Sequence, residues 1–262
     1  MSTNKTQPPF PVCRILGVNI AVTNMSRTLD YLKDHLEKLS GSYICISNVH
    51  TTVMSYEDPA YRKIQNSAVL ALPDGAPLSA VCRKRGFPEA ERVTGPDLMG
   101  EIFRISVREG YRHYFYGSTQ ETLDALEVSL MEKYPGIRIA GMYAPPFRPL
   151  SEGEDQGVVE QINRAQADFV WVGLGAPKQE LWMAEHRKKI QGLMIGVGAG
   201  FDYHAGTLKR APGWMQRCSL EWVYRLLQDP GRLWKRYWVT NRKFLRLVRR
   251  ENNICQSRKN SI

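Results

Sequence analysis

The sequence predicts an α/β fold in which a mostly parallel sheet is covered by helices on both faces. Short apolar runs rich in β-branched and aromatic residues alternate with segments of helical periodicity. The runs are almost continuously apolar, which is typical of strands buried on both sides. With 43% hydrophobic and 24% charged residues among 262, the composition excludes a disordered, collagen-like or disulfide-dense chain.

Seven apolar runs are expected to form the strands. Each is four to nine residues long and is bounded by polar or glycine-containing segments, and several carry consecutive valines, isoleucines or aromatic residues. They cover residues 14–22, 43–49, 69–72, 113–116, 138–142, 169–172 and 193–197.

Helices are expected between these strands. Thr94 or Asp97 is suited to cap the helix at 96–109, and Thr119 precedes the helix at 120–133. The full set covers residues 26–39, 77–85, 96–109, 120–133, 154–165 and 179–189.

The chain changes character near its C-terminus. After residue 219 no further strand is expected, only two basic, aromatic-rich helices joined by a turn at 229–231, followed by a polar end that we expect to fray. We therefore divide the chain into an α/β catalytic domain, residues 1–212, and a helical C-terminal appendage, residues 213–262. No internal repeat is present.

Charge is distributed very unevenly. The net charge is +10, yet residues 207–262 hold 14 basic and three acidic side chains, and the rest of the chain holds 22 basic and 23 acidic ones. A near-neutral body with a basic tail predicts an anionic partner for the tail. No apolar run approaches the ~20 residues of a membrane-spanning helix. Five cysteines without a CxxC pair and no secretion signal lead us to expect reduced thiols and a cytoplasmic location.

Polar residues follow two of the predicted strands. Ser47, Asn48 and Thr51 come after the strand at 43–49, and Asp74 comes after the strand at 69–72. Ligands of parallel α/β sheets bind beyond the carboxyl ends of the strands, so these residues are candidates for a site. The alternative interpretation is structural: Asn48 and Thr51 would then only cap the next helix, and Asp74 would only shape a turn.

Two glycine-rich loops follow later strands. In residues 173–180, Gly175 lets the backbone approach a ligand, and Lys178 and Gln179 offer a cation and an amide at the start of a helix whose N-terminus attracts anions. Residues 196–202 carry glycine at every second position. That pattern fits either a second ligand loop or a strand packed closely on a helix.

Common catalytic and metal-binding signatures are missing from the sequence. It has no GxSxG, HExxH, GxGxxG or P-loop pattern, and its histidines show no metal-ligand spacing. It also has no Asp-x-Asp, so a diphosphate handled without a metal would be neutralised by Arg, Lys and helix N-termini. We expect neither a metal nor a cofactor.

Four motifs together resemble the WecG/TagA/CpsF glycosyltransferases, glycosyltransferase family 26. They are PDG at 73–75, ERVTGPDLM at 91–99, GLGAPKQELW at 173–182 and the long segment 196–237. The resemblance runs from about residue 14 to about 245. It implies a Rossmann-like, often dimeric enzyme of bacterial cell-surface polysaccharide synthesis. Such an enzyme transfers a sugar, with inversion, from a UDP-sugar to a polyprenyl-diphosphate-linked saccharide at the inner face of the plasma membrane.

The resemblance also implies roles for single residues. Asp74 matches the proposed catalytic base, and Asn48 matches the asparagine of the family's T-x-N stretch. Ile46 replaces the threonine of that stretch, whose hydroxyl Ser47 or Thr51 would have to supply. Arg92 matches an arginine implicated in binding and Gln179 a glutamine near the donor. In the appendage, the residues that match arginines thought to engage the diphosphate are Arg225, Arg232 and either Lys235 or Arg236. The donor is implied to be UDP-N-acetylmannosamine or a related sugar, or UDP-glucose.

The appendage also predicts attachment to an anionic membrane surface. Its aromatic residues alternate with cations, and Trp and Tyr favour the headgroup region while each Lys or Arg adds ~1 kcal/mol near an anionic leaflet. These aromatic residues are Trp222, Tyr224, Trp234, Tyr237, Trp238 and Phe244.

Two other functional classes fit less well. A basic, aromatic tail is also typical of a nucleic-acid-binding protein, but the near-neutral body and its glycine-rich loops favour a small-molecule site, so we expect no nucleic acid. A dinucleotide-dependent oxidoreductase would need a glycine fingerprint after the first strand, which the sequence lacks.

Overall fold

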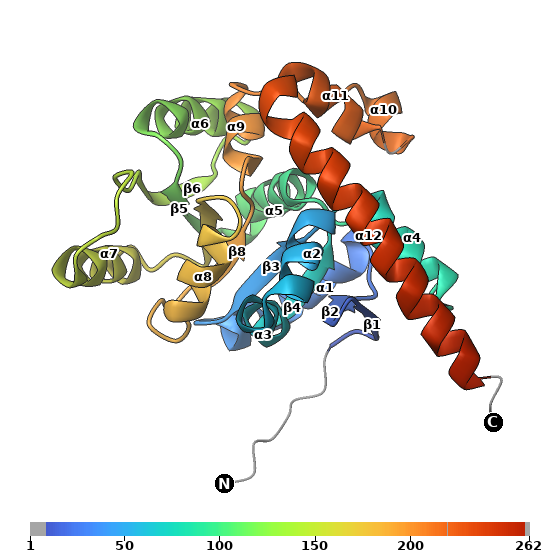
Figure 1. Ribbon diagram of the computed structural model, residues 1–262. Coiled ribbons are helices and arrows are strands. Elements are labelled where there is room, and N and C mark those ends of the chain that lie inside the picture. Colours follow the sequence, from blue (N-terminus) through green and yellow to red (C-terminus); the bar gives the residue numbers. More distant parts are fainter. Residues whose placement is uncertain (1–8, 219, 260–262) are drawn as a thin grey trace, which may run out of the picture.

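A six-stranded, all-parallel sheet forms the centre of the molecule (Figure 1). The computed structural model describes residues 9–218 and 220–259, without the side chains of residues 217, 232–233, 235–237 and 254–259. The strand order is β4-β3-β8-β7-β5-β6. The strands are β3 (Tyr43–Ser47), β4 (Leu70–Pro73), β5 (Arg112–Gly117), β6 (Arg138–Tyr143), β7 (Phe169–Gly173) and β8 (Leu193–Gly196). The predicted α/β class is confirmed.

Both faces of the sheet are buried, as the continuous apolar runs predict. Alternate residues of one strand point to opposite faces, and Ile44 and Ile46 of β3 lie in one core cluster whereas Tyr43 and Cys45 lie in another. The first face is covered by α1 (Met25–His35), α5 (Gly95–Glu109), α6 (Gln120–Lys133) and α9 (Gly200–Ala205). The second face is covered by α3 (Pro59–Ser67), α7 (Glu152–Arg164) and α8 (Lys178–Glu185). A 3-10 helix, η1 (Leu36–Leu39), follows α1.

Several helix starts are fixed by the capping residues that the sequence indicates. The Thr94 hydroxyl accepts a hydrogen bond from the backbone of Asp97 at the start of α5, and Thr119 caps α6 in the same way. Thr94, rather than Asp97, is therefore the cap of α5. Ser151 and Glu154 form a reciprocal capping box at the start of α7.

The first predicted strand, residues 14–22, is wrong as a single element. The chain instead forms an antiparallel hairpin of β1 (Val12–Ile15) and β2 (Val18–Ala21) outside the main sheet. Leu16 and Gly17, both at positive φ, make the tight turn. The apolar run continues through this turn, so its hydrophobicity hides the reversal of the chain.

A third core cluster joins the hairpin to helices on this side of the molecule. It includes Val53 of α2 (Val49–Glu57), Leu78 and Cys82 of α4 (Ala76–Lys84), and Phe244 and Val248 near the C-terminus. The thiols of Cys13, Cys45, Cys82 and Cys218 are free, and the Cys255 side chain lies outside the described residues.

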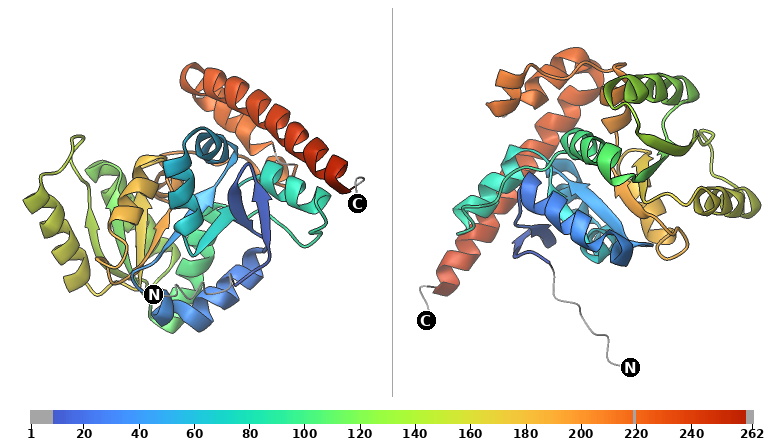
Figure 2. Two further views of the ribbon diagram at one scale, coloured as in Figure 1. Left: turned by 60° about the horizontal axis from the view of Figure 1, so that its bottom comes forward. Right: turned by 180° about the vertical axis from the view of Figure 1, so that it is seen from behind.

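The C-terminal segment is helical, as expected, but the fraying expected of its polar end is wrong as far as Lys259, and residues 260–262 lie outside the described residues. It forms α10 (Gly213–Arg217), α11 (Glu221–Gln228) and a 30-residue helix, α12 (Pro230–Lys259), which crosses one side of the body toward β1 and α4 (Figures 1 and 2). Phe244 and Val248 are buried there, and Glu251 forms an ion pair with Arg85 of 2.7 Å and accepts the backbone N–H of Leu16. Apolar burial, with these polar contacts beside it, therefore holds this end of the helix on the body.

Candidate active site

The carboxyl ends of β3, β4 and β8 lie side by side and bring three of the candidate loops together. Ser47 at the end of β3 is opposite Pro73 at the end of β4, and the backbone N–H of Asp74 donates to the Ser47 carbonyl at 2.7 Å. β8 pairs with β3 on its other side. This edge of a parallel sheet is where α/β proteins bind ligands.

The polar residues after β3 serve the fold first. The Asn48 side chain accepts the backbone N–H groups of His50 and Thr51, and the Thr51 hydroxyl accepts the N–H of Asn48 in return. Ser47 is fully buried and donates to Oε1 of Gln65 at 2.6 Å. Thus the capping alternative holds for Asn48 and Thr51, and the hydroxyls of both Ser47 and Thr51 are satisfied inside the body.

Asn48 has a second contact, because its side chain also hydrogen-bonds to the carboxylate of Asp74. The amide oxygen of Asn48 is used by the helix cap, so the amide N–H is the group that suits a carboxylate. One residue therefore starts α2 and orients Asp74.

Asp74 is the carboxylate that follows β4, the outermost strand on this side of the sheet. Burial raises its pKa to about 6, and the charge of Glu221 adds to the rise, whereas the Asn48 hydrogen bond and the charges of Arg225 and Arg92 oppose it. A carboxyl group with this pKa is mostly ionised at pH 7 to 8 and is a stronger base than an exposed aspartate.

Arg92 reaches the site from the segment before α5. That segment lies beside the end of β4, because the Val93 N–H donates to the Pro73 carbonyl at 2.8 Å. Arg92 also forms an ion pair with Glu221 at 3.7 Å. The structure therefore brings Arg92 to the Asp74 carboxylate from a separate part of the chain.

Arg225 reaches the same place from the appendage. Its charge lowers the pKa of Asp74 and of Asp202, so its guanidinium lies near both carboxylates. It also lies over the Tyr203 ring, 5.9 Å from the centroid. The structure brings Arg225 near Asp74, and the side chains of Arg232, Lys235 and Arg236 lie outside the described part of the chain.

The two glycine-rich loops are held together by Gln179. Its Oε1 accepts the N–H of Gly175 at 3.2 Å and that of Gly198 at 3.0 Å, while its amide N–H donates to Glu180 at 2.8 Å. Gln179 is buried and Lys178 is exposed at the first position of α8. Gln179 thus shapes both loops from below.

Close packing explains part of the glycine pattern after β8. A Cβ atom on Gly196 would lie 2.8 Å from Met183 Cε and 3.0 Å from Gln179 Nε2, and one on Gly200 would lie 2.6 Å from Met99 Sδ. Gly198 has φ +52° and offers its N–H to Gln179. The pattern therefore combines strand-on-helix packing with a loop turn.

Glu180 is a fully buried carboxyl group beneath these loops. Burial raises its pKa, and hydrogen bonds from Gln179 and Tyr61 oppose the rise. Tyr61 continues through Gln65 to Ser47, so a chain of buried polar groups links β3 to α8. Such a network fixes the loops relative to each other.

Four functional candidates were missed by sequence reasoning: Asp202, Glu180, Arg210 and Glu221. All four lie inside the motifs that carry the family resemblance, but motif membership gives no role to an individual residue. Arg210 and Glu221 reach Asp97 and Arg92 only through contacts between distant segments.

The described residues contain no group of three or more His, Cys, Asp or Glu side chains arranged to hold a metal ion. Nor, within residues 9–218 and 220–259, is any helix long and apolar enough to cross a membrane.

Comparison with known proteins identifies the family. The model of the "Glycosyl transferase WecG/TagA/CpsF family" matches residues 13–258. The chain belongs to the WecG/TagA/CpsF family. It is therefore a glycosyltransferase, from a family of UDP-sugar hexosyltransferases, and the match covers both the α/β body and the helical appendage.

Two curated relatives are similar in sequence to this chain over most of their length. A Bacillus subtilis (strain 168) protein is 31% identical over 236 residues, 88% of this chain and 89% of its own. A Staphylococcus aureus (strain MW2) protein is 30% identical over 225 residues, 85% of each chain. Both are named N-acetylglucosaminyldiphosphoundecaprenol N-acetyl-beta-D-mannosaminyltransferase.

Proposed function

We propose that the protein transfers N-acetylmannosamine, with inversion, from UDP-N-acetylmannosamine to a polyprenyl-diphosphate-linked N-acetylglucosamine acceptor. The names of the relatives support this donor and acceptor. The observation that carries the proposal is Asp74, a carboxylate of raised pKa at the carboxyl edge of the sheet, within electrostatic reach of Arg92 and Arg225.

In the proposed reaction Asp74 acts as the general base. The acceptor hydroxyl attacks the anomeric carbon of the donor as its proton passes to the Asp74 carboxylate. The bond between the anomeric carbon and the UDP oxygen breaks, and UDP leaves with the bonding electrons. One displacement at this carbon inverts its configuration, and one carboxylate suffices for it.

We propose that arginines, rather than a metal ion, neutralise the negative charge of the leaving diphosphate. Arg92 and Arg225 approach Asp74 from two segments, and guanidinium groups bind phosphate oxygens in a charge-assisted, often bidentate manner. Arg232 and Arg236, in α12 of the appendage, are further candidates for this role. Positive groups fixed where negative charge develops stabilise the transition state.

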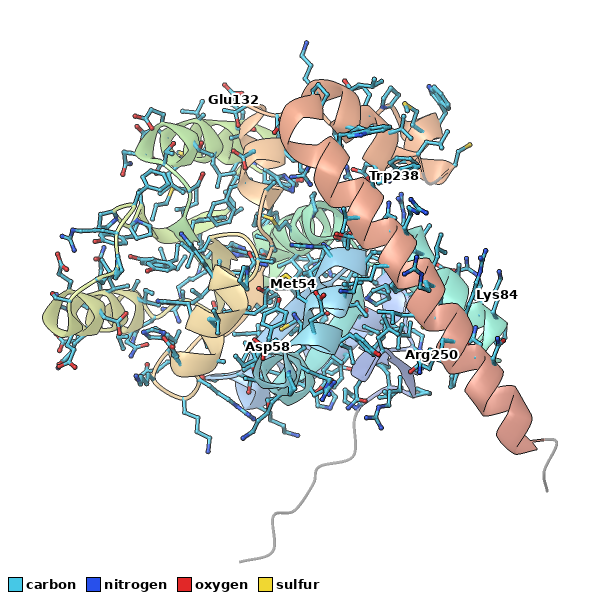
Figure 3. The ribbon with its side chains drawn as sticks, viewed as in Figure 1. Met54, Asp58, Lys84, Glu132, Trp238 and Arg250 are labelled. Atoms are coloured by element: carbon cyan, nitrogen blue, oxygen red, sulfur yellow. The ribbon has the colours of Figure 1, made fainter. Side chains whose placement is uncertain are left out.

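We further propose that the appendage attaches peripherally to the anionic inner face of the plasma membrane. Trp222, Trp234 and Trp238 are each about half exposed, and Trp234 stacks on Trp238 with centroids 6.0 Å apart. Figure 3 shows Trp238 on α12. Arg242 lies over the Trp238 ring at 5.2 Å. Exposed tryptophans next to cations suit the headgroup region. Phe244, in contrast, is buried against the body and has no part in this surface.

The proposal is tested by measuring UDP release, with EDTA present, from a panel of UDP-sugars and a synthetic lipid-diphosphate-N-acetylglucosamine acceptor. We expect release with UDP-N-acetylmannosamine, and its loss in Asp74→Asn, which keeps the shape and hydrogen bonding of the side chain but cannot accept the proton. Release with UDP-glucose instead would change the donor and keep the mechanism. Full activity of Asp74→Asn would overturn the mechanism, and a requirement for a divalent metal would overturn metal independence.

A further inference from the structure

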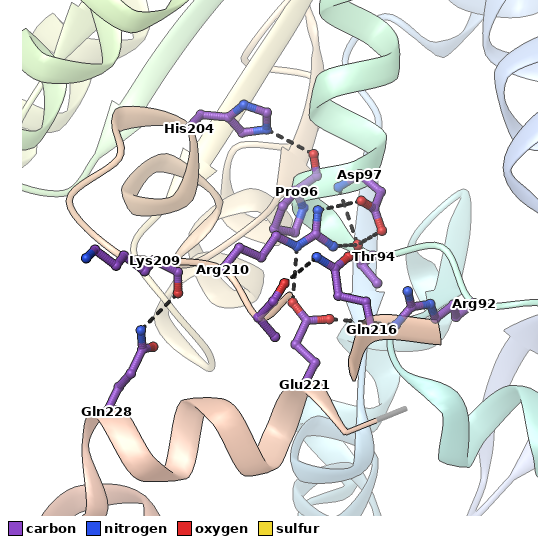
Figure 4. A network of polar contacts seen from close by, with 11 residues as sticks. Arg92, Thr94, Pro96, Asp97, His204, Lys209, Arg210, Gln216, Glu221 and Gln228 are labelled. Atoms are coloured by element: carbon purple, nitrogen blue, oxygen red, sulfur yellow. Dashed lines mark hydrogen bonds and ion pairs between the residues drawn. The ribbon is translucent and has the colours of Figure 1, made fainter. Parts of the chain in front are cut away.

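Arg210 connects the N-terminus of α5 in the body to the start of α11 in the appendage. Arg210 lies in the segment between α9 and α10, and its guanidinium reaches three acceptors (Figure 4). It bonds to Asp97 Oδ1 at 2.5 Å and Thr94 Oγ1 at 3.4 Å, both at the N-terminus of α5, and to Glu221 Oε1 at 3.2 Å at the start of α11. The planar guanidinium is suited to several acceptors at once.

The body side of this connection is itself rigid. The Thr94 hydroxyl caps α5 and donates to Asp97 Oδ2 at 2.6 Å. Burial raises the pKa of Asp97, but the hydrogen bonds from Arg210 and Thr94 outweigh burial and hold it below its usual value. Asp97 is therefore ionised at neutral pH and fixes Arg210.

Glu221 is shared by two arginines of different segments. Its Oε1 contacts Arg210, and its Oε2 forms an ion pair with Arg92 Nη1 at 3.7 Å. As the first residue of α11 it also suits the positive end of that helix. The Glu221 carboxylate thus joins α11 to both body arginines at the rim of the site.

Arg225 is placed by the same contact. It lies four residues after Glu221, so both side chains are on one face of α11. Arg225 is near Asp74 and Asp202 and lies over Tyr203. Docking of Glu221 on the body therefore determines where Arg225 lies.

We propose that Glu221 is a positioning residue, which docks α11 on Arg210 and Arg92 and thereby holds Arg225 beside Asp74. This inference rests on the function proposed above, in which Asp74 is the base. Three charged groups face Asp74: Glu221 and Arg225 from α11, and Arg92 from the segment before α5. Glu221 itself faces Arg92 and Arg210.

The test compares Glu221→Gln with Glu251→Gln across the pH dependence of kcat/KM from pH 5 to 9. Both glutamates belong to the appendage and pair with a body arginine, but Glu251 pairs with Arg85 beside the β1–β2 hairpin. We expect Glu221→Gln to lower kcat/KM at pH 8 at least about 10-fold, because Arg225 loses its support. The acid limb should also move slightly to lower pH, because losing the Glu221 charge, the larger influence on the Asp74 pKa, is only partly offset by the displacement of Arg225. Glu251→Gln should change neither.

A second variant reverses the expected sign. Arg210→Gln leaves the Glu221 charge beside Asp74 with one cation fewer, so kcat/KM should fall while its acid limb moves to higher pH. Glu221→Asp, which keeps the charge, should leave the limb in place. If Glu221→Gln does not fold, as judged by thermal unfolding, the Arg210→Gln profile decides.

The inference is overturned if the pH profile of Glu221→Gln is the same as that of the wild type, or if Glu251→Gln shows the same changes as Glu221→Gln. It is also overturned if the acid limb of Arg210→Gln does not move to higher pH. Asp74→Asn in the same assay separates the two proposals. An active Asp74→Asn defeats the proposed mechanism, whereas an inactive one beside an unaffected Glu221→Gln defeats only the role of Glu221.

Discussion

The two ends of the appendage are attached to the body in different ways. Near residue 250, α12 is held by burial: Phe244 and Val248 lie in a core cluster with the β1–β2 hairpin, and the Glu251–Arg85 pair lies beside them. Near residue 221, the described contacts with the body are mainly polar, through Arg210, Arg92 and Glu221.

This difference suits the two ends of the appendage to different tasks: the end near residue 250 anchors the helix, and the end near residue 221 positions Arg225. Apolar burial is strong and insensitive to ligands, so the far end is suited to anchoring. Ion pairs that are a quarter exposed are weaker and respond to nearby charge. The end that carries Arg225 to Asp74 is thus the one that an arriving anion is able to influence.

The largest expected effect is at the anchored end. Phe244→Ala removes a side chain that is 2% exposed, and a deletion of this kind costs about 3–5 kcal/mol of unfolding free energy. Urea denaturation measures it. The matched control is Leu245→Ala, where the side chain is 53% exposed and the change should be small. Equal effects of the two variants would show that α12 does not pack as described.

At the other end the expected loss is in activity. Arg225→Ala removes a positive charge beside Asp74, and we expect kcat/KM to fall about 10²–10³-fold, the usual scale for one fixed electrostatic group. The unfolding free energy should change little, because Arg225 is partly exposed. Arg104→Ala, on the exposed side of α5, is the control and should retain activity. A similar loss in both variants would contradict a local role for Arg225.

The ionised carboxylate of Asp74 should lower the unfolding free energy of the protein. Because the folded pKa of Asp74 is about 6 against 3.8 for an ordinary aspartate, the ionised form opposes folding. This cost is fully present above pH 6 and absent below pH 4. Asp74→Asn should therefore stabilise the fold by up to about 3 kcal/mol at pH 8, and by less at pH 5.

Denaturation of Asp74→Asn at the two pH values checks this, with Asp124→Asn, an exposed residue of α6, as the control. A destabilised Asp74→Asn would mean that the Asn48 and arginine contacts outweigh burial.

The smallest effect belongs to the ion pair of the anchored end. Glu251→Gln should cost no more than about 1 kcal/mol of unfolding free energy, because its pair with Arg85 is partly exposed. Thermal or urea unfolding beside Phe244→Ala measures the ratio. A Glu251→Gln effect as large as that of Phe244→Ala would show that ions, and not apolar packing, hold this end.

Local patterns sufficed for most of the fold. Buried strands, capped helices and the change of character after residue 219 all depend on neighbours in sequence, and the caps at Thr94 and Thr119 were readable directly. The hairpin at Leu16–Gly17 was missed because its turn lies inside an apolar run. The anchored end of α12 was missed because Phe244 is read as a tail aromatic unless its partners in β1 and α4 are known.

The site was only partly predictable for the same reason. Asp74, Asn48 and Arg92 follow from strand ends and family motifs. Glu221 and Arg210 do not, because their importance comes from contacts with Arg92 and Asp97 across more than 100 residues. Ser47 and Thr51 have suitable hydroxyls in suitable places, and only their buried partners reveal that the fold already uses them.

The central claim is that the Asp74 carboxylate is the base of the transfer reaction, and the pH dependence of wild-type kcat/KM tests it most directly. The ionised carboxylate is the active form, so activity should fall on the acid side with a slope of one proton and an apparent pKa of about 6. A profile that stays flat down to pH 5 would contradict it.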